Sequence, residues 1–370
     1  MTVPSRSDSP LAIVIVGLTI TSSWGNGHAT TYRALIRALA ARGHRVTFLE
    51  CDKPWYRDNR DCPQPEGCRT ELYGDPADLA ARFRDLVRSA DLAVVGSYVP
   101  DGVEVGHWVQ ETARGITAFY DIDTPVTLAR LARGDREYLT PDLIPGYDLY
   151  LSFTGGPTLR RLEREFGSPM ARPLYCSADP DAYFPDPDAA VRWDLGYLGT
   201  YSTDRQPTLD RLLLEPARRW EEGRFAVVGP QYPADILWPA NVLRIEHMPP
   251  REHRAFYTAQ RFTLNVTRAD MIAAGWSPSV RLFEAAACGV PIISDRWEGL
   301  DELFVPGREI VIADSAGQAL ATLSGMDEEE RRAMGLAARR RFLDGHTPLH
   351  RAQALEGYVL EAREARRVAS

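Results

Sequence analysis

Residues 11–50 read LAIVIVGLTITSSWGNGHATTYRALIRALAARGHRVTFLE, and their pattern predicts the fold of the first half of the chain. Residues 11–18 are a continuous apolar run, as expected for a strand buried on both faces of a parallel sheet. Residues 30–42 follow with apolar side chains at helical spacing, and residues 45–50 predict a second strand. A strand, a helix and a strand in this order indicate parallel pairing through a right-handed crossover.

The alternation of strands and helices continues along the whole chain. In the first half, further strands are predicted at residues 92–97, 116–121 and 148–153. After a proline- and aspartate-rich stretch, the sequence pattern of the second half predicts strands at residues 195–198, 225–228, 242–245, 262–266 and 291–294. Helices are predicted there at residues 207–220, 251–258, 279–288, 315–323, 327–344 and 348–367. We therefore expect an α/β protein of two Rossmann-like domains whose sheets face each other across a cleft.

Changes in composition along the chain suggest where the domains begin and end. Residues 177–189, SADPDAYFPDPDA, are the candidate linker. We expect four parts: a flexible tail, the first domain, the second domain and a C-terminal crossover helix, at residues 1–10, 11–180, 181–345 and 346–370. Because parallel sheets bind ligands beyond the carboxyl ends of their strands, functional residues should lie in the strand-to-helix loops.

The composition of the chain limits the classes of function. Its 370 residues include 43 basic and 51 acidic side chains, and the net charge of −8 disfavours sequence-independent binding of nucleic acid. No apolar run reaches the roughly 18 residues needed to span a bilayer, so we expect no transmembrane segment and a cytoplasmic protein. Five cysteines form no C-x-x-C pair. Cys62 and Cys68 share one loop without evident partner ligands, so we expect free thiols and no metal.

A glycine-containing loop, residues 19–29 (TITSSWGNGHA), joins the first strand to the first helix. Gly25 and Gly27 allow its backbone to approach a ligand closely, and the helix that follows offers free N–H groups. NAD binding is one interpretation, because Gly25, Gly27 and Glu50 imitate part of the dinucleotide fingerprint. Thr30 stands where that fingerprint has its third glycine, which disfavours this interpretation.

Residues 277–295, SPSVRLFEAAACGVPIISD, carry the strongest sign of a binding site. Ser279 is placed to cap a helix whose free N–H groups, beginning at Val280, would bind a diphosphate. Arg281 lies in the first turn, where a cation opposes the helix dipole and is better explained by a bound phosphate. Glu284 is placed to accept hydrogen bonds from ribose hydroxyls. The alternative for Arg281 and Glu284 is a solvent-exposed salt bridge at helical spacing.

The run FEAAACGVP within this segment resembles the F-E-A-x-A-C-G-x-P pattern of the group 1 glycosyltransferases of the GT-B fold. A wider match to the CgeB-like spore-maturation glycosyltransferases includes YDIDTP, LGTYSTDRQ, LNVTR and HTPLHRA, at residues 120–125, 198–206, 264–268 and 346–352. The resemblance implies a C-terminal helix that packs back on the N-terminal domain. Relatives often pair Glu284 with a preceding acid in an E-x7-E pattern. Here Trp276 takes that position, so sugar recognition by that carboxylate is not carried over.

The resemblance also implies donor-binding roles elsewhere in the second half. It places Arg205 near the donor diphosphate and His247 near the nucleobase. Gly229 and Arg268 stand at strand ends, where Gly229 would lie near the base and Arg268 would reach phosphate or sugar. The alternative for Arg205 and His247 is an ordinary surface position.

In the first half, residues 25–50 resemble the opening of many GT-B enzymes. The resemblance implies an acceptor-side loop formed by Gly25, Asn26 and Gly27. His28 would sit at the start of the helix and either position the acceptor or take its proton.

The segment YDIDTP places two carboxylates, those of Asp121 and Asp123, near the end of a strand. Asp121 would lie beside the acceptor, and Asp123 is a second candidate base. The alternative for both is an Asx turn that leads into Pro125.

Together these features predict transfer of a sugar from a UDP-, TDP- or GDP-linked donor to a hydroxyl or amine of a small-molecule or glycan acceptor. Neither a metal nor a cofactor is expected, because guanidinium and helix N–H groups would stabilise the leaving diphosphate. The resemblance favours retention of anomeric configuration. A nucleotide-sugar epimerase, an NAD-dependent oxidoreductase and a non-catalytic spore or envelope binding protein remain as alternatives.

Overall fold

The computed structural model describes residues 10–24 and 27–369, and the chain divides into two compact units. Unit 1 comprises Met1–Cys176 and Pro348–Ser370, and unit 2 comprises Ser177–Thr347. Unit 2 therefore takes in the predicted linker. None of the helices in the described ranges is long and apolar enough to cross a lipid bilayer.

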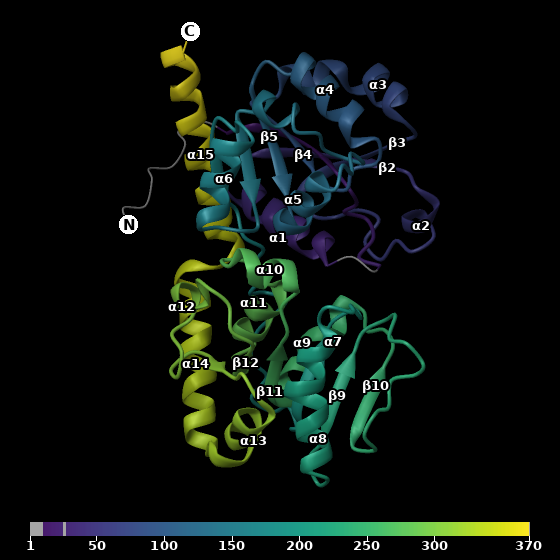
Figure 1. Ribbon diagram of the computed structural model, residues 1–370. Coiled ribbons are helices and arrows are strands. Elements are labelled where there is room, and N and C mark those ends of the chain that lie inside the picture. Colours follow the sequence, from purple (N-terminus) through teal and green to yellow (C-terminus); the bar gives the residue numbers. More distant parts are fainter. Residues whose placement is uncertain (1–9, 25–26, 370) are drawn as a thin grey trace. The chain divides into compact units, whose positions relative to one another are not determined.

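Unit 1 is built on a seven-stranded parallel sheet with strand order β3-β2-β1-β4-β5-β6-β7 (Figure 1). Its strands are β1 (Ala12–Gly17), β2 (Arg45–Cys51), β3 (Cys68–Tyr73), β4 (Leu92–Gly96), β5 (Ile116–Asp121), β6 (Leu149–Ser152) and β7 (Ala171–Pro173). Its helices are α1 (His28–Ala41), α2 (Pro54–Arg57), α3 (Pro76–Ser89), α4 (Gly102–Thr112), α5 (Thr124–Ala132), η1 (Ile144–Gly146), α6 (Pro157–Glu165) and α15 (Pro348–Ala369). All of β1 after its first residue is buried, as the apolar run predicted.

The C-terminal helix α15 packs beside α1 in unit 1, which confirms that part of the predicted fold (Figure 1). Glu356 of α15 is 5% exposed and accepts hydrogen bonds from Arg42 Nε at 2.5 Å and Arg42 Nη2 at 2.7 Å. His44 Nε2 lies 2.6 Å from the same carboxylate, while His44 Nδ1 accepts from the Leu11 N–H. Because His44 Nδ1 is an acceptor, its Nε2 must be the donor to Glu356.

Unit 2 is a six-stranded parallel sheet with strand order β10-β9-β8-β11-β12-β13. Its strands are β8 (Trp193–Leu198), β9 (Phe225–Val228), β10 (Val242–Ile245), β11 (Gln260–Asn265), β12 (Ile292–Ser294) and β13 (Val311–Ile312). Its helices are α7 (Gln206–Leu209), η2 (Asp210–Leu214), α8 (Glu215–Arg219), α9 (Pro250–Thr258), α10 (Ala269–Ala274), α11 (Val280–Ala287), α12 (Leu300–Leu303), α13 (Ala316–Gly325) and α14 (Glu328–Gly345). Apolar side chains of β8, β9 and β11 form the centre of its core.

Several elements differ from the expectation from sequence, among them the short strands β7 and β13 and the short helices α10 and α12, which were not predicted. Strand β3 was not predicted, because its residues CRTELY lie at the sheet edge, are mostly half-buried and lack an apolar run. The single helix predicted at residues 207–220 is instead α7 and α8 separated by the π-helical turn η2.

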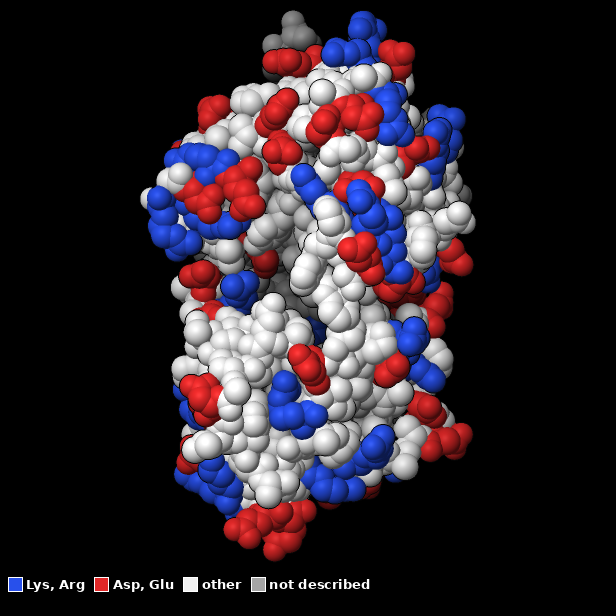
Figure 2. Space-filling model, turned by 90° about the vertical axis from the view of Figure 1, so that its right-hand side faces the viewer, with Lys and Arg blue, Asp and Glu red and all other residues white. Residues whose placement is uncertain are grey.

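On the face that Figure 2 shows, basic and acidic side chains are intermixed in each unit, so the described part of that face carries no continuous field of one sign.

Candidate functional site

The strand order of unit 2 reverses beside β8. The chain runs from β8 outward through β9 to β10, then returns to β11 on the other side of β8 and continues through β12 to β13. In open parallel sheets, ligands bind outside the carboxyl ends of the strands at such a reversal. The candidate site of unit 2 therefore lies where β8 and β11 end.

Arg281 of α11 joins the ends of these two strands. Its Nε donates to the Leu198 carbonyl at the end of β8 at 2.5 Å, and its Nη1 donates to Asn265 Oδ1 at the end of β11 at 3.0 Å. The guanidinium also lies 4.7 Å from the ring centre of Tyr197 and is 7% exposed as a residue. Within the described residues, Nη2 makes no hydrogen bond. It faces the loop at Gly199, where an added Cβ would lie 2.8 Å from it. The solvent-exposed salt bridge considered from the sequence is wrong for this buried arginine.

Ser279 occupies the N-cap position of α11, but the predicted cap is wrong. Its hydroxyl donates to Asn265 Oδ1 at 2.8 Å instead of accepting from a helix N–H group. Asn265 in turn donates its Nδ2 to Thr267 and Ser294, which fixes the orientation of its amide. The first N–H groups of the helix, beginning at Val280, therefore have no side-chain cap in the described structure. The contact of Ser279 with Asn265 places this end of the helix beside the end of β11.

Glu284 lies inside unit 2 and is 4% exposed. Its Oε2 accepts from the Tyr257 hydroxyl at 2.8 Å, and the Tyr183 hydroxyl bonds to the same carboxylate. Burial and the charge of this carboxylate hold the pKa values of the Tyr183 and Tyr257 hydroxyls well above the usual range for tyrosine. The exposed salt bridge is wrong here too, and the predicted contact with ribose stays a prediction.

The loops after β8 and β9 approach each other at two glycines. Gly229 has φ +147°, and an added Cβ would lie 2.0 Å from the Gly199 carbonyl oxygen, so only glycine fits there. Arg205 stands at the start of α7 on the β8 side, where its Nη2 donates to the Thr200 carbonyl at 3.0 Å. Its buried Nε has no partner in the described structure.

Arg268 immediately precedes α10 at the end of the segment that follows β11. It is half-buried and forms no ion pair with any described residue. The reversal point thus has three guanidinium groups. Arg205 follows β8, Arg268 follows β11, and Arg281 bonds to the ends of both strands. An anion is the ligand that such a set suits.

His247 is exposed in the loop after β10, and its predicted nucleobase contact stays a prediction. Arg244, a residue that the sequence did not single out, reaches inward instead. Its Nη2 donates to the Gly229 carbonyl at 2.9 Å, and its guanidinium lies 4.2 Å and 4.8 Å from the ring centres of Tyr232 and Trp238. Burial lowers its pKa. The signal available in the sequence was an arginine that closely follows the aromatic-containing run QYPADILW, residues 231–238, because arginine packs on aromatic faces.

Trp276, which stands in place of the expected acid, has an unusual backbone. Its φ of 43° is in the left-handed region, and its N–H donates to the Glu298 carbonyl at 2.7 Å. The indole lies directly against Gly299, where an added Cβ would come within 2.4 Å of it. Close packing therefore maintains a bulky residue in a conformation that such residues rarely adopt.

In unit 1 the strand order reverses between β1 and β4. The loop after β1 is held by Glu50 of β2, whose Oε2 accepts from the Ile20 N–H at 2.7 Å and the Thr21 N–H at 3.0 Å. Its Oε1 accepts from the Thr21 hydroxyl at 2.6 Å. Glu50 is completely buried, so this acid has a structural role that accounts for it without a bound dinucleotide. Of the predicted acceptor loop, Gly25 and Asn26 lie outside the described residues, and Gly27 is exposed beside α1.

His28, Tyr98 and Asp123 come together at the ends of three neighbouring elements of unit 1. His28 is the first residue of α1, and its ring stacks on that of Tyr98 with 6.3 Å between centres and 8° between planes. The Tyr98 hydroxyl donates to Asp123 Oδ2 at 3.1 Å. Burial lowers the pKa of His28, and the negative charge of Asp123 opposes that effect. An imidazole beside a carboxylate is an arrangement that accepts protons.

Asp121 does not lie beside an acceptor, because it is completely buried. Its carboxylate accepts from the Tyr150 hydroxyl at 2.5 Å, the Thr127 hydroxyl at 2.8 Å and the Asp123 N–H at 3.2 Å. Burial raises its pKa to about 6. The predicted acceptor contact is thus corrected to a supporting role beneath Asp123. The D-x-D spacing of Asp121 and Asp123 therefore offers one accessible carboxylate, not two.

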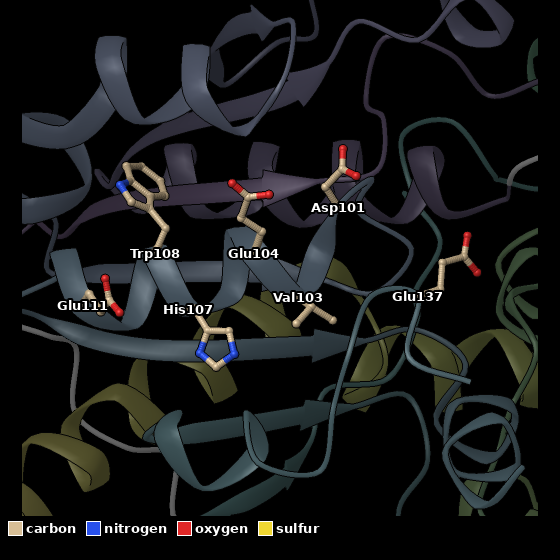
Figure 3. A pocket seen from close by; sticks show the side chains of 7 residues that line it. All are labelled: Asp101, Val103, Glu104, His107, Trp108, Glu111 and Glu137. Carbon is tan, nitrogen blue, oxygen red and sulfur yellow. The ribbon is translucent and has the colours of Figure 1, made fainter. Parts of the chain in front are cut away.

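A separate groove of about 600 Å³ runs along α4, lined by acidic residues together with His107, Trp108 and Val103 (Figure 3). None of the site residues predicted from the sequence lines this groove.

The described residues contain no group of three or more side chains that would hold a metal ion. Cys62 and Cys68 are half-buried free thiols.

Known proteins resemble the chain over both units. Residues 205–357 match the family described as glycosyl transferase-like. Over 163 residues, 38% of this chain, the sequence is 27% identical to UDP-glycosyltransferase 79B11 of Arabidopsis thaliana, and the chain spans about a third (34%) of that relative's length.

Solved structures are similar over almost the entire chain. Sucrose-phosphate synthase of Thermosynechococcus elongatus has a TM-score of 0.65 at 15% identity, covering 97% of this chain and 100% of that one. Anabaena HepE in complex with UDP and glucose has a TM-score of 0.69 at 12% identity, covering 94% and 98%. An alpha-glucosyltransferase in complex with UDP-glucose and DNA has a TM-score of 0.71 at 11% identity, covering 95% and 100%. These similarities confirm the predicted fold class.

Proposed function

We propose that this chain, which has the GT-B fold and a glycosyl transferase-like segment, transfers a sugar from a nucleoside diphosphate sugar to an acceptor hydroxyl or amine. The observation that carries the proposal is Arg281 at the reversal point of unit 2, beside the uncapped N-terminus of α11. A diphosphate is stabilised there by hydrogen bonds and by the helix dipole. The same groups would stabilise the charge that develops on the leaving diphosphate.

The donor is best sought among UDP-sugars, with TDP- and GDP-sugars as the comparison. HepE and the alpha-glucosyltransferase were solved with UDP or UDP-glucose, and the Arabidopsis relative is a UDP-glycosyltransferase. Arg205 and Arg268 would contribute further positive charge to the diphosphate, and the Gly229–Arg244 region would lie near the base. The net charge of −8 favours a small-molecule or glycan acceptor over a nucleic acid.

His28, with Asp123 beside it, would take the proton of the acceptor. In this step the acceptor oxygen forms a bond to the anomeric carbon, and its proton moves to an imidazole nitrogen of His28. The bond from the anomeric carbon to the diphosphate oxygen breaks, and its electron pair stays with the diphosphate. The resulting imidazolium is stabilised by the carboxylate of Asp123.

The stereochemical course separates two versions of the proposal. A base pair such as His28 and Asp123 serves direct displacement, which inverts the anomeric configuration. The motif in residues 283–291 instead supports retention, for which no protein base is needed. The NMR coupling constant of the anomeric proton in the product distinguishes the two versions.

Metal independence and a cytoplasmic location also belong to the proposal. Three guanidinium groups supply the positive charge that a divalent ion would otherwise give to the diphosphate. All five cysteines are free thiols, which supports a reducing compartment.

The experiment that tests the function is turnover of UDP-, TDP- and GDP-sugars across an acceptor panel, with and without a chelator, together with calorimetry of the free nucleotides. We expect binding of one nucleoside diphosphate and transfer that the chelator leaves unchanged. A donor incubated without acceptor should not be converted to its epimer, and NADH should cause no fluorescence change. Absence of nucleotide binding would overturn the proposal.

A further inference from the structure

The loop between β4 and α4 is strained where it meets the site of unit 1. Tyr98 and Asp101 have φ values of 64° and 55°, in the left-handed region that residues with side chains rarely occupy. For a bulky residue such as tyrosine, this conformation persists only when the surroundings impose it. Ser97 ties the loop to the end of β5, because its N–H donates to the Tyr120 carbonyl and its hydroxyl accepts from the Ile122 N–H.

The strained conformation directs the Tyr98 side chain at both members of the proposed base pair. Its hydroxyl donates to Asp123 Oδ2 at 3.1 Å, and its ring lies parallel to the His28 ring. Tyr98 therefore contacts Asp123 through its hydroxyl and His28 through its ring. Packing also fixes the ring, since Tyr138 lies 4.8 Å from it and the Arg130 guanidinium 5.8 Å.

A second set of hydrogen bonds holds Asp123 from beneath. The buried carboxylate of Asp121 accepts from the Asp123 N–H and from the Thr127 hydroxyl, and Thr127 is bonded to Tyr138 at 2.8 Å. The backbone of Asp123 is thus fixed by Asp121, while its carboxylate is held by Tyr98. Truncation of Tyr98 would free the carboxylate without releasing the backbone.

We infer that Tyr98 is a positioning residue for proton transfer, which orients the Asp123 carboxylate toward His28 through its hydroxyl. The inference rests on the proposed function. Tyr98 itself neither gives nor takes the proton. Burial and the charge of Asp123 hold the pKa of its hydroxyl far above the usual range, so the phenol remains a donor at neutral pH. The charged groups around it are Asp123, Asp121, Arg130 and, once protonated, His28.

The first test measures the pKa of His28 by NMR titration in the whole chain and needs no substrate. In Tyr98→Phe the carboxylate is no longer held beside the imidazole, so the pKa of His28 should fall. Tyr147→Phe is the matched control, because it removes a buried hydroxyl of unit 1 that has no partner in the described structure. An unchanged His28 pKa in Tyr98→Phe would overturn the inference.

The second test is a double-mutant cycle on the donor substrate, with UDP-glucose hydrolysis as the probe and water in place of the acceptor. Tyr98→Phe should lower kcat by about tenfold without changing the affinity for UDP, and should have no further effect in an Asp123→Asn background. Additive effects would show that Tyr98 acts by packing alone and would overturn the inference. If the wild type binds no nucleotide, the proposed function itself fails. If the wild type turns over donor but Tyr98→Phe behaves as Tyr147→Phe does, only the inference fails.

Discussion

The two units share a topology but differ in the chemistry at the point where the strand order reverses. In unit 2, three arginines and an uncapped helix N-terminus gather where β8 and β11 end. In unit 1, the corresponding position beyond β1 and β4 holds an imidazole, a phenol and a carboxylate. One sheet therefore presents groups that stabilise negative charge, and the other presents groups that move a proton.

The comparison shows how one architecture supports two halves of a reaction. Parallel strands bring loops to one edge of each sheet, whatever residues those loops carry. Arg281 is held by the Leu198 carbonyl and the Asn265 amide, so its position is set by strand ends. Asp123 is held by Tyr98 and Asp121, which also follow or end strands. If the division is correct, variants in the two units should affect different quantities.

The largest effect is expected for His28→Ala under the inverting version of the proposal, in which His28 is the base. Loss of the base should lower kcat for sugar transfer about 100- to 10,000-fold. The affinity for UDP should stay unchanged, because no residue of unit 2 is altered. Steady-state kinetics and calorimetry measure the two quantities, and a weakened affinity for UDP in this variant would break the proposed division.

A second effect concerns Asp121, whose pKa burial raises to about 6 from the usual 3.8. Below pH 3.8 both the folded and unfolded states bind the proton, so the carboxyl has no effect on stability. Between pH 3.8 and 6 only the folded state keeps the proton, so stability decreases as pH rises. The free energy of unfolding of the wild type, relative to Asp121→Asn, should fall by roughly 2 kcal/mol between pH 4 and pH 7. Urea unfolding at several pH values tests this, and a difference independent of pH would contradict it.

Local patterns in the sequence were sufficient to predict the fold and to single out Arg281. Apolar runs such as that of β1 persist because both faces of a parallel sheet are covered, and the same pattern holds in unit 2. Arg281 was recognisable because a cation in the first turn of a helix needs an explanation. Neither inference depends on contacts between residues far apart in sequence.

The supporting residues could not be predicted, because their roles depend on tertiary contacts and backbone dihedral angles. Asp121 and Asp123 look equivalent in sequence, yet the first ends buried in β5 and the second lies beyond the strand and is half-buried. Tyr98 and Arg244 reach their partners only through the packing of other elements. Serine is a residue type that often caps helices, but the Ser279 hydroxyl donates to Asn265 Oδ1 instead.

The donor side of the comparison is tested by Arg281→Lys, which keeps the charge but loses the planar fork. A lysine lacks the rigid fork whose Nε and Nη1 donate separately to the Leu198 carbonyl and Asn265 Oδ1, so its ammonium would be held less firmly at the reversal point. We expect a roughly 10- to 100-fold loss of affinity for UDP. The exposed Arg218 of α8 provides the control, since Arg218→Lys should bind UDP as the wild type does.

The smallest effect is expected for Arg268→Ala, because this side chain is half-buried and lacks an ion-pair partner among the described residues. If its guanidinium reaches the bound diphosphate through solvent, the affinity for UDP should fall by roughly two- to fivefold. The loss should shrink as salt is raised, because added ions screen partly exposed charges. Arg218→Ala removes a positive charge from the same unit and should have no effect. Equal losses in the two variants would mean that only the net charge of unit 2 matters, and Arg268 would no longer belong to the anion site.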